Sequence, residues 1–353
     1  MIFKWPDFCL LFGIIFLPSC STDPVDVNTN ILPLVTGPYK EHGLIMMLAD
    51  SAGGYTAASG HNLFRIAPES PDTAGNVVSY VGQYFSSIYG LFNDDFNRKS
   101  IITGNGIYSF DEDFSATLQV EFFPPESLNI SHFTVDWKGQ CWYFLQSTDY
   151  HYQVYRYTKG FTVLCTDSYV TRGDLWGAKF AAADDRFAVS SGYYCWETWL
   201  DLYNQDTLER SIRLFSDADS AYITCLCYIG NELQITANCF KSIFSNSRKL
   251  SADTGAFLIP GTNVFRIDRN GKITNHFQNS WNYSFFFGYH CFYRSSRETW
   301  LWDSTTYCVV TPDTMVQHDF RDGYANRFNV PCFKDSSEVQ LFDEVTQRFI
   351  KIK

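Results

Sequence analysis

The chain has 353 residues, enough for about two average domains or for one large repetitive domain. Aromatic residues make up 18% of it, charged residues another 18%, and the formal net charge is −11. A composition this rich in aromatic side chains excludes intrinsic disorder, because disordered chains have few such groups to bury. The acidic balance argues against nucleic acid as a partner, since binding to phosphates needs Lys and Arg.

The N-terminal segment has the pattern of an export signal. Lys4 precedes a ten-residue apolar run from Phe8 to Leu17. A membrane-spanning helix needs about 20 apolar residues, so a run half that long is typical of a signal peptide. We therefore assign residues 1–19 to a signal peptide.

The end of this segment, Leu17-Pro18-Ser19-Cys20-Ser21, resembles the lipobox of bacterial lipoproteins. The resemblance covers this segment alone, and it implies that Cys20 is lipidated and becomes the mature N-terminus. Two or three acyl chains give stable membrane anchoring, whereas one chain is marginal. The alternative is an ordinary secretory signal in which Cys20 has no role.

Residues 20–38 are predicted to form a flexible tether, because prolines and a glycine interrupt them and no apolar periodicity is present. Asp23 and Asp26 follow Cys20 closely, which resembles the surface-export signal of lipoproteins in the Bacteroides group. The expected location is the bacterial cell envelope, with a lipid anchor in the outer membrane or at the cell surface.

A short strand pattern recurs through the rest of the chain, from residue 39 to residue 353. Each copy has an apolar, an aromatic, a polar and an apolar residue, or a looser version of this order. Between the second residues of successive copies the spacings are 44, 47, 45, 65, 43 and 32 residues. The seven copies are Leu63–Ile66, Ile107–Phe110, Val154–Tyr157, Trp199–Leu202, Val264–Ile267, Tyr307–Val310 and Val339–Phe342.

A unit of about 45 residues with four short strands has the size of a propeller blade. We therefore predict an all-β fold, a β-propeller of six or seven four-stranded blades, over residues 39–353; the alternative is a β-sandwich or barrel with accidental regularity. The 65-residue spacing predicts an insertion at Lys241–Pro260. The first strand, Leu44–Leu48, and the last, Arg348–Ile352, are expected in one closing blade, because closure removes exposed sheet edges.

Standard catalytic motifs are missing from the sequence, which contains no G-x-S-x-G, H-E-x-x-H, Walker or C-x-x-C pattern. No cofactor and no metal site is predicted. Ser251–Leu258 resembles one Asp-box of the sialidase-like propellers, in which Asp and Ser cap a tight turn. The alternative is an ordinary polar loop. The acidic pairs, such as Asp94-Asp95 and Asp184-Asp185, are interpreted mostly as solvated turns.

Nine cysteines remain once Cys9 is removed with the signal and Cys20 is lipidated. An odd number leaves at least one free thiol or one bond outside the chain. Cys225 and Cys227 are predicted on one face of a strand, near the limit of disulfide reach. We interpret most cysteines as small buried hydrophobic residues.

Two aromatic clusters beside turn residues are the candidate ligand-binding residues. They suit glycans or peptides, because aromatic faces offer a large apolar area at a low entropic cost. The alternative is that these side chains fill the space between blades, as Trp199 is expected to do from its strand. The candidates are Tyr193, Tyr194, Trp196, Trp281 and Tyr283.

These features favour a membrane-anchored extracytoplasmic propeller that binds a glycan, a peptide or a protein partner. One alternative is a propeller enzyme that acts on a polysaccharide as a hydrolase or lyase, with its catalytic residues unknown. Another is an assembly factor in an envelope complex. The fold alone does not separate these functions.

The lipid anchor gives the first prediction. Replacing Cys20 with Ala removes the only thiol at the expected cleavage position, so the variant should incorporate no palmitate label and should leave the membrane fraction. The measurement is metabolic labelling followed by fractionation. A variant that still carries the label would show that the lipoprotein assignment is wrong.

Overall fold

A computed structural model covers the chain. The residues it describes are 35–37, 46–50, 54–60, 63–66, 77–80, 87–111, 116–122, 133–148, 151–170, 178–191, 198–215, 221–239, 248–249, 257–258, 261–278, 290–302, 306–319, 329–333, 339–343 and 348–351.

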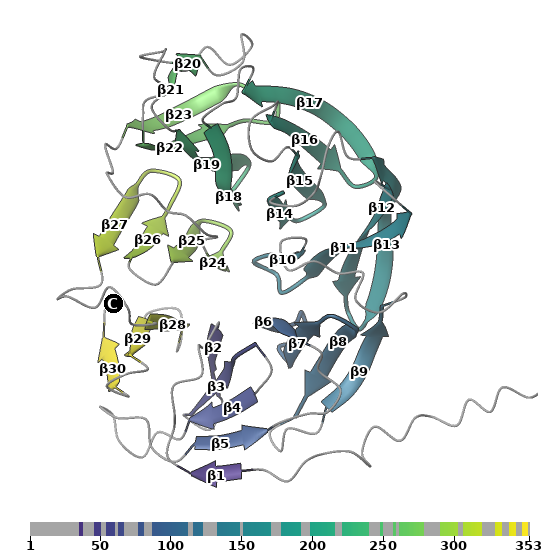
Figure 1. Cartoon of the computed structure of the whole chain (residues 1–353), viewed down its shortest axis with the longest axis vertical. Helices are drawn as coiled ribbons and strands as arrows, with labels where there is room; N and C mark the ends of the chain where they lie inside the picture. The colour runs from purple at the N-terminus through teal and green to yellow at the C-terminus, as the bar shows by residue number, and fades with distance from the viewer. Residues whose placement is uncertain are drawn as a thin grey trace, which may run out of the picture.

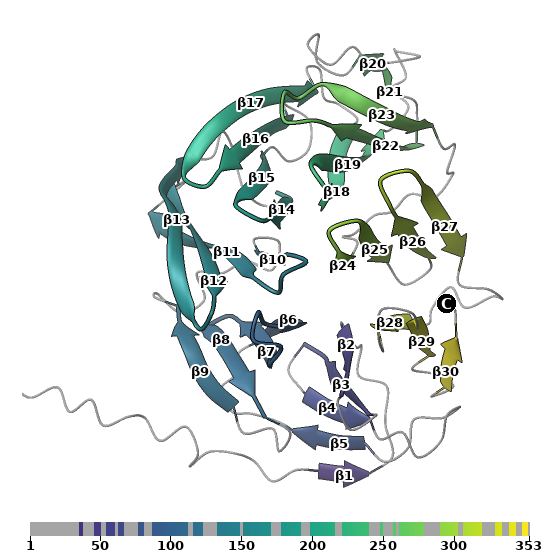
Figure 2. The same ribbon diagram turned by 180° about the vertical axis from the view of Figure 1, so that it is seen from behind.

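The described strands form a β-propeller, in which antiparallel sheets stand around a common axis like the blades of a fan (Figures 1 and 2). Six blades have four strands each, and each blade is a meander in which consecutive strands pair. Blade 1 contains β2 (Met46–Ala49), β3 (Tyr55–Ala58), β4 (Leu63–Ile66) and β5 (Val77–Tyr80). Blade 2 contains β6 (Ile88–Asn93), β7 (Lys99–Thr103), β8 (Gly106–Phe110) and β9 (Ala116–Glu121). Blade 3 contains β10 (Phe133–Val135), β11 (Cys141–Thr148), β12 (His151–Thr158) and β13 (Phe161–Val170).

Blades 4 to 6 continue the ring. Blade 4 contains β14 (Phe180–Ala183), β15 (Arg186–Ser191), β16 (Thr198–Asn204) and β17 (Thr207–Phe215). Blade 5 contains β18 (Ala221–Ile229), β19 (Glu232–Cys239), β22 (Gly261–Ile267) and β23 (Ile273–Gln278). Blade 6 contains β24 (His290–Ser295), β25 (Glu298–Trp302), β26 (Thr306–Val310) and β27 (Met315–Asp319). The all-β propeller predicted from the 45-residue spacing is confirmed.

A three-stranded meander closes the ring between blades 6 and 1. It consists of β28 (Asn329–Phe333), β29 (Val339–Asp343) and β30 (Arg348–Lys351). The inner strand β2 pairs in parallel with β28, and this pairing joins blade 1 to the meander in one eight-stranded sheet. The first and last predicted strands therefore share a sheet, but β30 lies at its outer edge and does not contact β2. At the opposite edge, β1 (Val35–Gly37) pairs with β5.

The seven repeated segments occupy equivalent places. Six of them are the third strand of a blade, namely β4, β8, β12, β16, β22 and β26, and the seventh is the middle strand β29 of the closing meander. The predicted insertion falls between β19 and β22 of blade 5, where the described part forms a small hairpin of β20 (Arg248–Lys249) and β21 (Phe257–Leu258). The repeat thus marks one strand in each blade, and the insertion lies within blade 5.

Aromatic side chains fill the space between neighbouring blades. Phe144 of blade 3 contacts Phe180 of blade 4 with ring centroids 4.7 Å apart. Within blade 4 the rings of Phe187 and Tyr203 stack at 4.5 Å. Trp142 of blade 3 is completely buried beside Phe187. This packing explains why a chain with few charges carries so many aromatic residues.

Two expectations about single side chains have different outcomes. Cys225 and Cys227 are buried free thiols, as expected. Trp199 in β16 is only half-buried, whereas the next residue, Leu200, is fully buried. The interpretation of Trp199 as a core residue is therefore wrong. Leu200 and Trp199 point to opposite faces of the sheet, and Trp199, the second residue of β16, is the less buried of the two.

The described residues contain no helix, and none of their segments is a helix long and apolar enough to cross a membrane.

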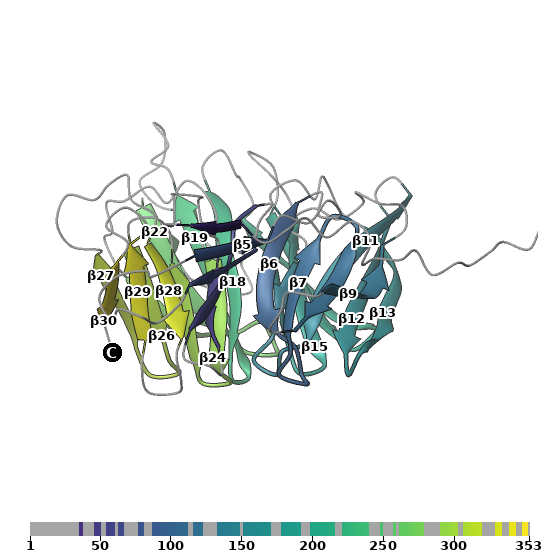
Figure 3. The ribbon, with the colours of Figure 1, turned by 90° about the horizontal axis from the view of Figure 1, so that it is seen from below.

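The two faces of the ring differ in their connections. Because consecutive strands run antiparallel, the connections between first and second strands and between third and fourth strands all emerge at one face, which we call the short-turn face (Figure 3). The connections between second and third strands, and between blades, emerge at the other face, which we call the long-connection face. Figure 3 shows the tight hairpins along the lower, short-turn side.

A five-residue turn recurs at the short-turn face. In each copy one carboxylate oxygen of the first residue, an Asp, accepts hydrogen bonds from the backbone N–H groups of the third and fifth residues. These distances are 3.0 and 2.8 Å in Asp94–Arg98, 2.9 and 3.0 Å in Asp136–Gln140, and 2.8 and 2.9 Å in Asp268–Lys272. We call these segments the Asp turns. Where the chain reverses, the Asp side chain thus accepts the backbone hydrogen bonds that strand pairing provides elsewhere.

The fourth residue of each Asp turn has a positive φ, which favours Gly or Asn. It is Asn97 (60°), Gly139 (80°) or Gly271 (72°). Gly139 also lies against the backbone of blade 2, where a Cβ would come within 2.5 Å of the Asn93 carbonyl oxygen. The turn therefore lets two blades approach closely.

This contact gives the second prediction. Gly139→Ala should lower the free energy of unfolding by about 3 kcal/mol or more, because an unfavourable φ is combined with a clash against backbone. Gly160→Ala is the matched control, since Gly160 has a φ of 77° but an ordinary 3.6 Å neighbour, and it should cost only about 1 kcal/mol. Equal losses in urea unfolding would contradict the close approach of the blades.

Candidate functional site

The five aromatic residues predicted to bind a ligand lie outside the described residues. They are Tyr193, Tyr194, Trp196, Trp281 and Tyr283. The strands on either side of them are described, however. The first three lie between β15 and β16, and the last two lie between β23 and β24, and both connections leave from the long-connection face. The topology thus assigns both clusters to connections on one side of the ring.

At the short-turn face, charged side chains join neighbouring blades. Between blades 1 and 2, the Lys99 ammonium contacts the Asp50 carboxylate, whose side chain is 6% exposed. Between blades 2 and 3, the Asp95 carboxylate accepts hydrogen bonds from the backbone N–H of Lys159 at 2.7 Å and from the hydroxyl of Thr158 at 2.6 Å. Each junction pairs a carboxylate with a donor of the next blade.

The junction between blades 3 and 4 has two ion pairs. Lys138 contacts Asp184 at 2.6 Å, and the guanidinium of Arg156 contacts the carboxylate of Asp185 at 2.5 Å. The two carboxylates belong to the turn between β14 and β15, so one turn of blade 4 receives two cations of blade 3. These two acids were interpreted as part of a solvated turn, and that interpretation omitted their role between blades.

The junction between blades 4 and 5 has a cation but a different set of acceptors. Arg186, at the start of β15, is 6% exposed. Its guanidinium donates to the carbonyl oxygen of Gly230 at 3.4 Å and to the backbone and side-chain oxygens of Asn231 at 3.3 and 3.2 Å. It also lies over the ring of Tyr228, 5.2 Å from the centroid. All of these partners are uncharged.

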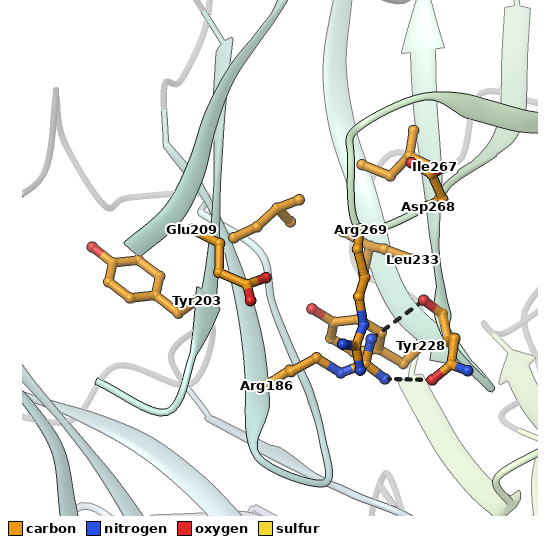
Figure 4. A pocket seen from close by; sticks show the side chains of 10 residues that line it. Arg186, Tyr203, Glu209, Tyr228, Leu233, Ile267, Asp268 and Arg269 are labelled. Atoms are coloured by element: carbon orange, nitrogen blue, oxygen red, sulfur yellow. Dashed lines mark hydrogen bonds between the residues drawn. The ribbon is translucent and has the colours of Figure 1, made fainter. Parts of the chain in front are cut away.

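A cleft opens at this junction (Figure 4). The space between its side chains is about 270 Å³ when the open solvent above them is included, and only a small part of it is enclosed. Blade 4 forms one wall and blade 5 the other. The lining residues are Arg186, Leu202, Tyr203, Glu209, Tyr228, Asn231, Leu233, Ile267, Asp268 and Arg269.

Three charged side chains line the cleft together with Tyr228. Burial raises the pKa of Tyr228 far above its usual value, Arg186 and Arg269 oppose that rise, and Glu209 adds to it. Figure 4 shows the two guanidinium groups in one part of the cleft and the Glu209 carboxylate in another, although Glu209 and Arg186 both belong to blade 4.

The next junction, between blades 5 and 6, also depends on an arginine. The guanidinium of Arg266 is buried and donates to the carbonyl oxygens of Thr311 and Pro312, and burial lowers its pKa. Unlike Arg186, this group has the carboxylate of Glu232 at 4.0 Å. Among the described residues, no carboxylate contacts Arg186, whereas a carboxylate lies near each of the other cations at these junctions.

Asp136 is an ionisable group in a neutral setting. Its carboxylate accepts a hydrogen bond from the indole N–H of Trp142 at 3.3 Å, in addition to the backbone bonds of its Asp turn. Asp94, in the same place of another turn, instead meets the guanidinium of Arg98 at 2.8 Å. Burial raises the pKa of Asp136 to about 6, although the hydrogen bonds from Gln140, Lys138 and Trp142 oppose the rise.

Sequence reasoning missed both the Asp turns and the cleft. Asp94, taken as part of a solvated turn, is 4% exposed. The turns could have been identified from a sequence pattern: an Asp is followed three residues later by a Gly or Asn, and the next strand begins two residues after that. The cleft had no such signal, because its arginines are 83 residues apart in the sequence. Over the residues described, no three His, Cys, Asp or Glu side chains gather as a metal site would require.

No protein-family model matches the sequence, and no curated protein matches it either. Solved structures do match in shape. The virginiamycin B lyase from Staphylococcus aureus superposes with a TM-score of 0.53 and 12% identity, over 90% of this chain and 98% of that one. A streptogramin B lyase gives 0.51 and 13%, over 90% and 96% of the two chains. The WD40 domain of Neurospora crassa Pan2 gives 0.50 and 8%, over 88% of each.

At such low identity these likenesses show the fold alone. They place the chain among the β-propellers, a class whose members here include two lyases and a WD40 domain. Function has to be argued from the residues of this chain.

The raised pKa of Asp136 gives the third prediction. A proton binds the folded state more tightly than the unfolded state, so this group stabilises the fold below about pH 4, and the contribution is lost as the pH rises through about 6. Relative to Asp136→Asn, which does not titrate, the parent should lose about 2 kcal/mol of unfolding free energy between pH 4 and pH 7. Urea unfolding of both proteins at several pH values measures this difference, and a pH-independent difference would contradict it.

Proposed function

We propose that the protein is a lipid-anchored propeller of the bacterial cell envelope, which binds a glycan, peptide or protein partner at its long-connection face. The anchor is Cys20, and the tether that separates the ring from the membrane is residues 20–34, which is shorter than the expected 20–38 because residues 35–37 form β1 and pair with β5. The ligand-binding residues are the aromatic clusters around Trp196 and Trp281.

The observation that carries this proposal is the unequal use of the two faces. At the short-turn face, Asp50, Asp95, Asp184 and Asp185 contact the neighbouring blade, and the Asp turns fix the hairpins. Their polar groups are engaged in holding the ring. Both aromatic clusters belong to connections that leave from the other face, which supports a shared ligand surface there.

Aromatic side chains in such connections suit ligands with flat or apolar faces. Tyr and Trp provide large contact areas with few rotatable bonds, so little conformational entropy is lost when a ligand binds. In a propeller, residues from different blades reach a common ligand only at the ends of the strands. A binding role therefore needs no rearrangement of the core.

The fourth prediction concerns this surface. Trp196→Ala and Trp281→Ala should each leave the melting temperature nearly unchanged and should weaken retention of the full chain on a glycan array or of partners from the native envelope. Trp142→Ala is the control, because this fully buried side chain should cost about 3–5 kcal/mol. If all three variants melt alike and far below the parent, the aromatic residues belong to the core and the proposed surface is wrong.

The same glycan panel tests the alternative function, a polysaccharide-active hydrolase or lyase. A binding protein should retain its glycan intact, with an unchanged chain length after incubation. Shorter products that form with the purified protein, and that no longer form after the protein is heat-treated, would favour the enzyme.

A further inference from the structure

We propose that the cleft between blades 4 and 5 is a second binding site, which holds a small oxyanion, a carboxylate or phosphate group, between the guanidinium groups of Arg186 and Arg269. The site lies at the short-turn face, on the other side of the ring from the proposed aromatic surface. It therefore does not depend on that function.

The first argument is the charge of Arg186. A buried guanidinium is costly unless a counter-charge and good hydrogen bonds compensate it. At the preceding junction Arg156 meets the carboxylate of Asp185, in the first turn of the next blade. The first turn of blade 5 presents Asn231, and within the described chain Arg186 forms no ion pair. The junction thus holds Arg186 in place, and among the described residues no carboxylate forms an ion pair with it.

The second argument is the geometry of its contacts. The three hydrogen bonds of Arg186 measure 3.2 to 3.4 Å, longer than the roughly 2.9 Å typical of strong N–H···O bonds. Charge-assisted bonds from arginine to an oxyanion are shorter and about twice as strong as neutral ones. An incoming oxyanion would therefore improve the contacts of this guanidinium.

Arg269 supplies the second cation. It belongs to the Asp turn of blade 5, whose carboxylate, Asp268, accepts the backbone N–H groups of Asn270 and Lys272. The turn fixes the backbone of Arg269, while its side chain is exposed at the rim of the cleft. In the view of Figure 4 its guanidinium overlaps that of Arg186, and both residues line the cleft. Two like charges at one end of a cleft repel each other, and an oxyanion between them would turn that repulsion into attraction.

Glu209 limits the strength of the site. It is exposed on the wall formed by blade 4, and among the residues described it forms no ion pair with either arginine. Its negative charge near the guanidinium pair would repel an anion. Removing that charge should therefore strengthen binding, whereas removing Arg269 should weaken it.

The fifth prediction follows from this opposition. Sodium acetate and inorganic phosphate should each be titrated into the purified full chain at constant ionic strength, with chloride as the reference anion, and followed by calorimetry and by the melting temperature. At least one oxyanion should bind saturably and raise the melting temperature. The comparison of acetate with phosphate shows whether the natural ligand is a carboxylate or a phosphate group.

Variants assign that binding to the cleft. Arg269→Gln should weaken the affinity about tenfold, because a charge-assisted contact is lost, and Glu209→Gln should strengthen it about threefold. Arg297→Gln is the matched control, since Arg297 is an exposed arginine in the β24–β25 turn of blade 6, and it should leave the affinity unchanged. The buried Arg186 is left in place, so folding does not confuse the result.

Three results would overturn the proposal. Binding of chloride as tight as that of both oxyanions would make the effect one of general screening. An equal loss of affinity in Arg297→Gln and Arg269→Gln would place the anion elsewhere. No saturable binding of acetate or phosphate to the parent would also exclude the site.

Discussion

The close packing of each blade against its two neighbours is the constraint on which the rest of the structure depends. A four-stranded sheet has two faces, and a blade buries both of them only when another blade lies on each side. The contacts that achieve this are large aromatic ones, such as Phe144 with Phe180 at 4.7 Å and Phe122 with Tyr143 at 4.7 Å. Flat rings fill the wedge between twisted sheets with few voids, so the aromatic content follows from the architecture.

At the inner strand of blade 4 the same packing is achieved with small side chains. The inner strand β14 contains three successive alanines, all buried, where neighbouring inner strands come close together. At the short-turn face it demands compact hairpins, and there the Asp turns combine a carboxylate acceptor with a residue that tolerates positive φ. Gly139 lies against the backbone of blade 2, so the shape of the turn and the short distance between the two blades depend on each other.

The sequence predicted the repeated parts of the fold well, because a repeat can be recognised from the regular spacing of its copies. The third strands were located by one pattern, and the 65-residue spacing located the insertion before β22. It could not predict that Trp199 is half-buried or that β2 pairs with β28. Both depend on how twisted sheets meet in space, and a local pattern does not contain that information. The cleft was beyond sequence reasoning for the same reason, since Arg186 and Arg269 come together only when blades 4 and 5 pack.

The charges of the short-turn face show how a structural surface can also acquire a binding role. At the junctions of blades 1 and 2 and of blades 3 and 4, a cation of one blade meets an acid of the other, and the pair is satisfied within the ring. At the junction of blades 4 and 5 the hydrogen-bond acceptors of Arg186 are neutral, so the structural contact persists without an ion pair among the described residues. The first turn of blade 5 presents Gly230 and Asn231, where that of blade 4 has Asp184 and Asp185. The repeated architecture thus allows one junction to change its chemistry while its neighbours continue to hold the ring together.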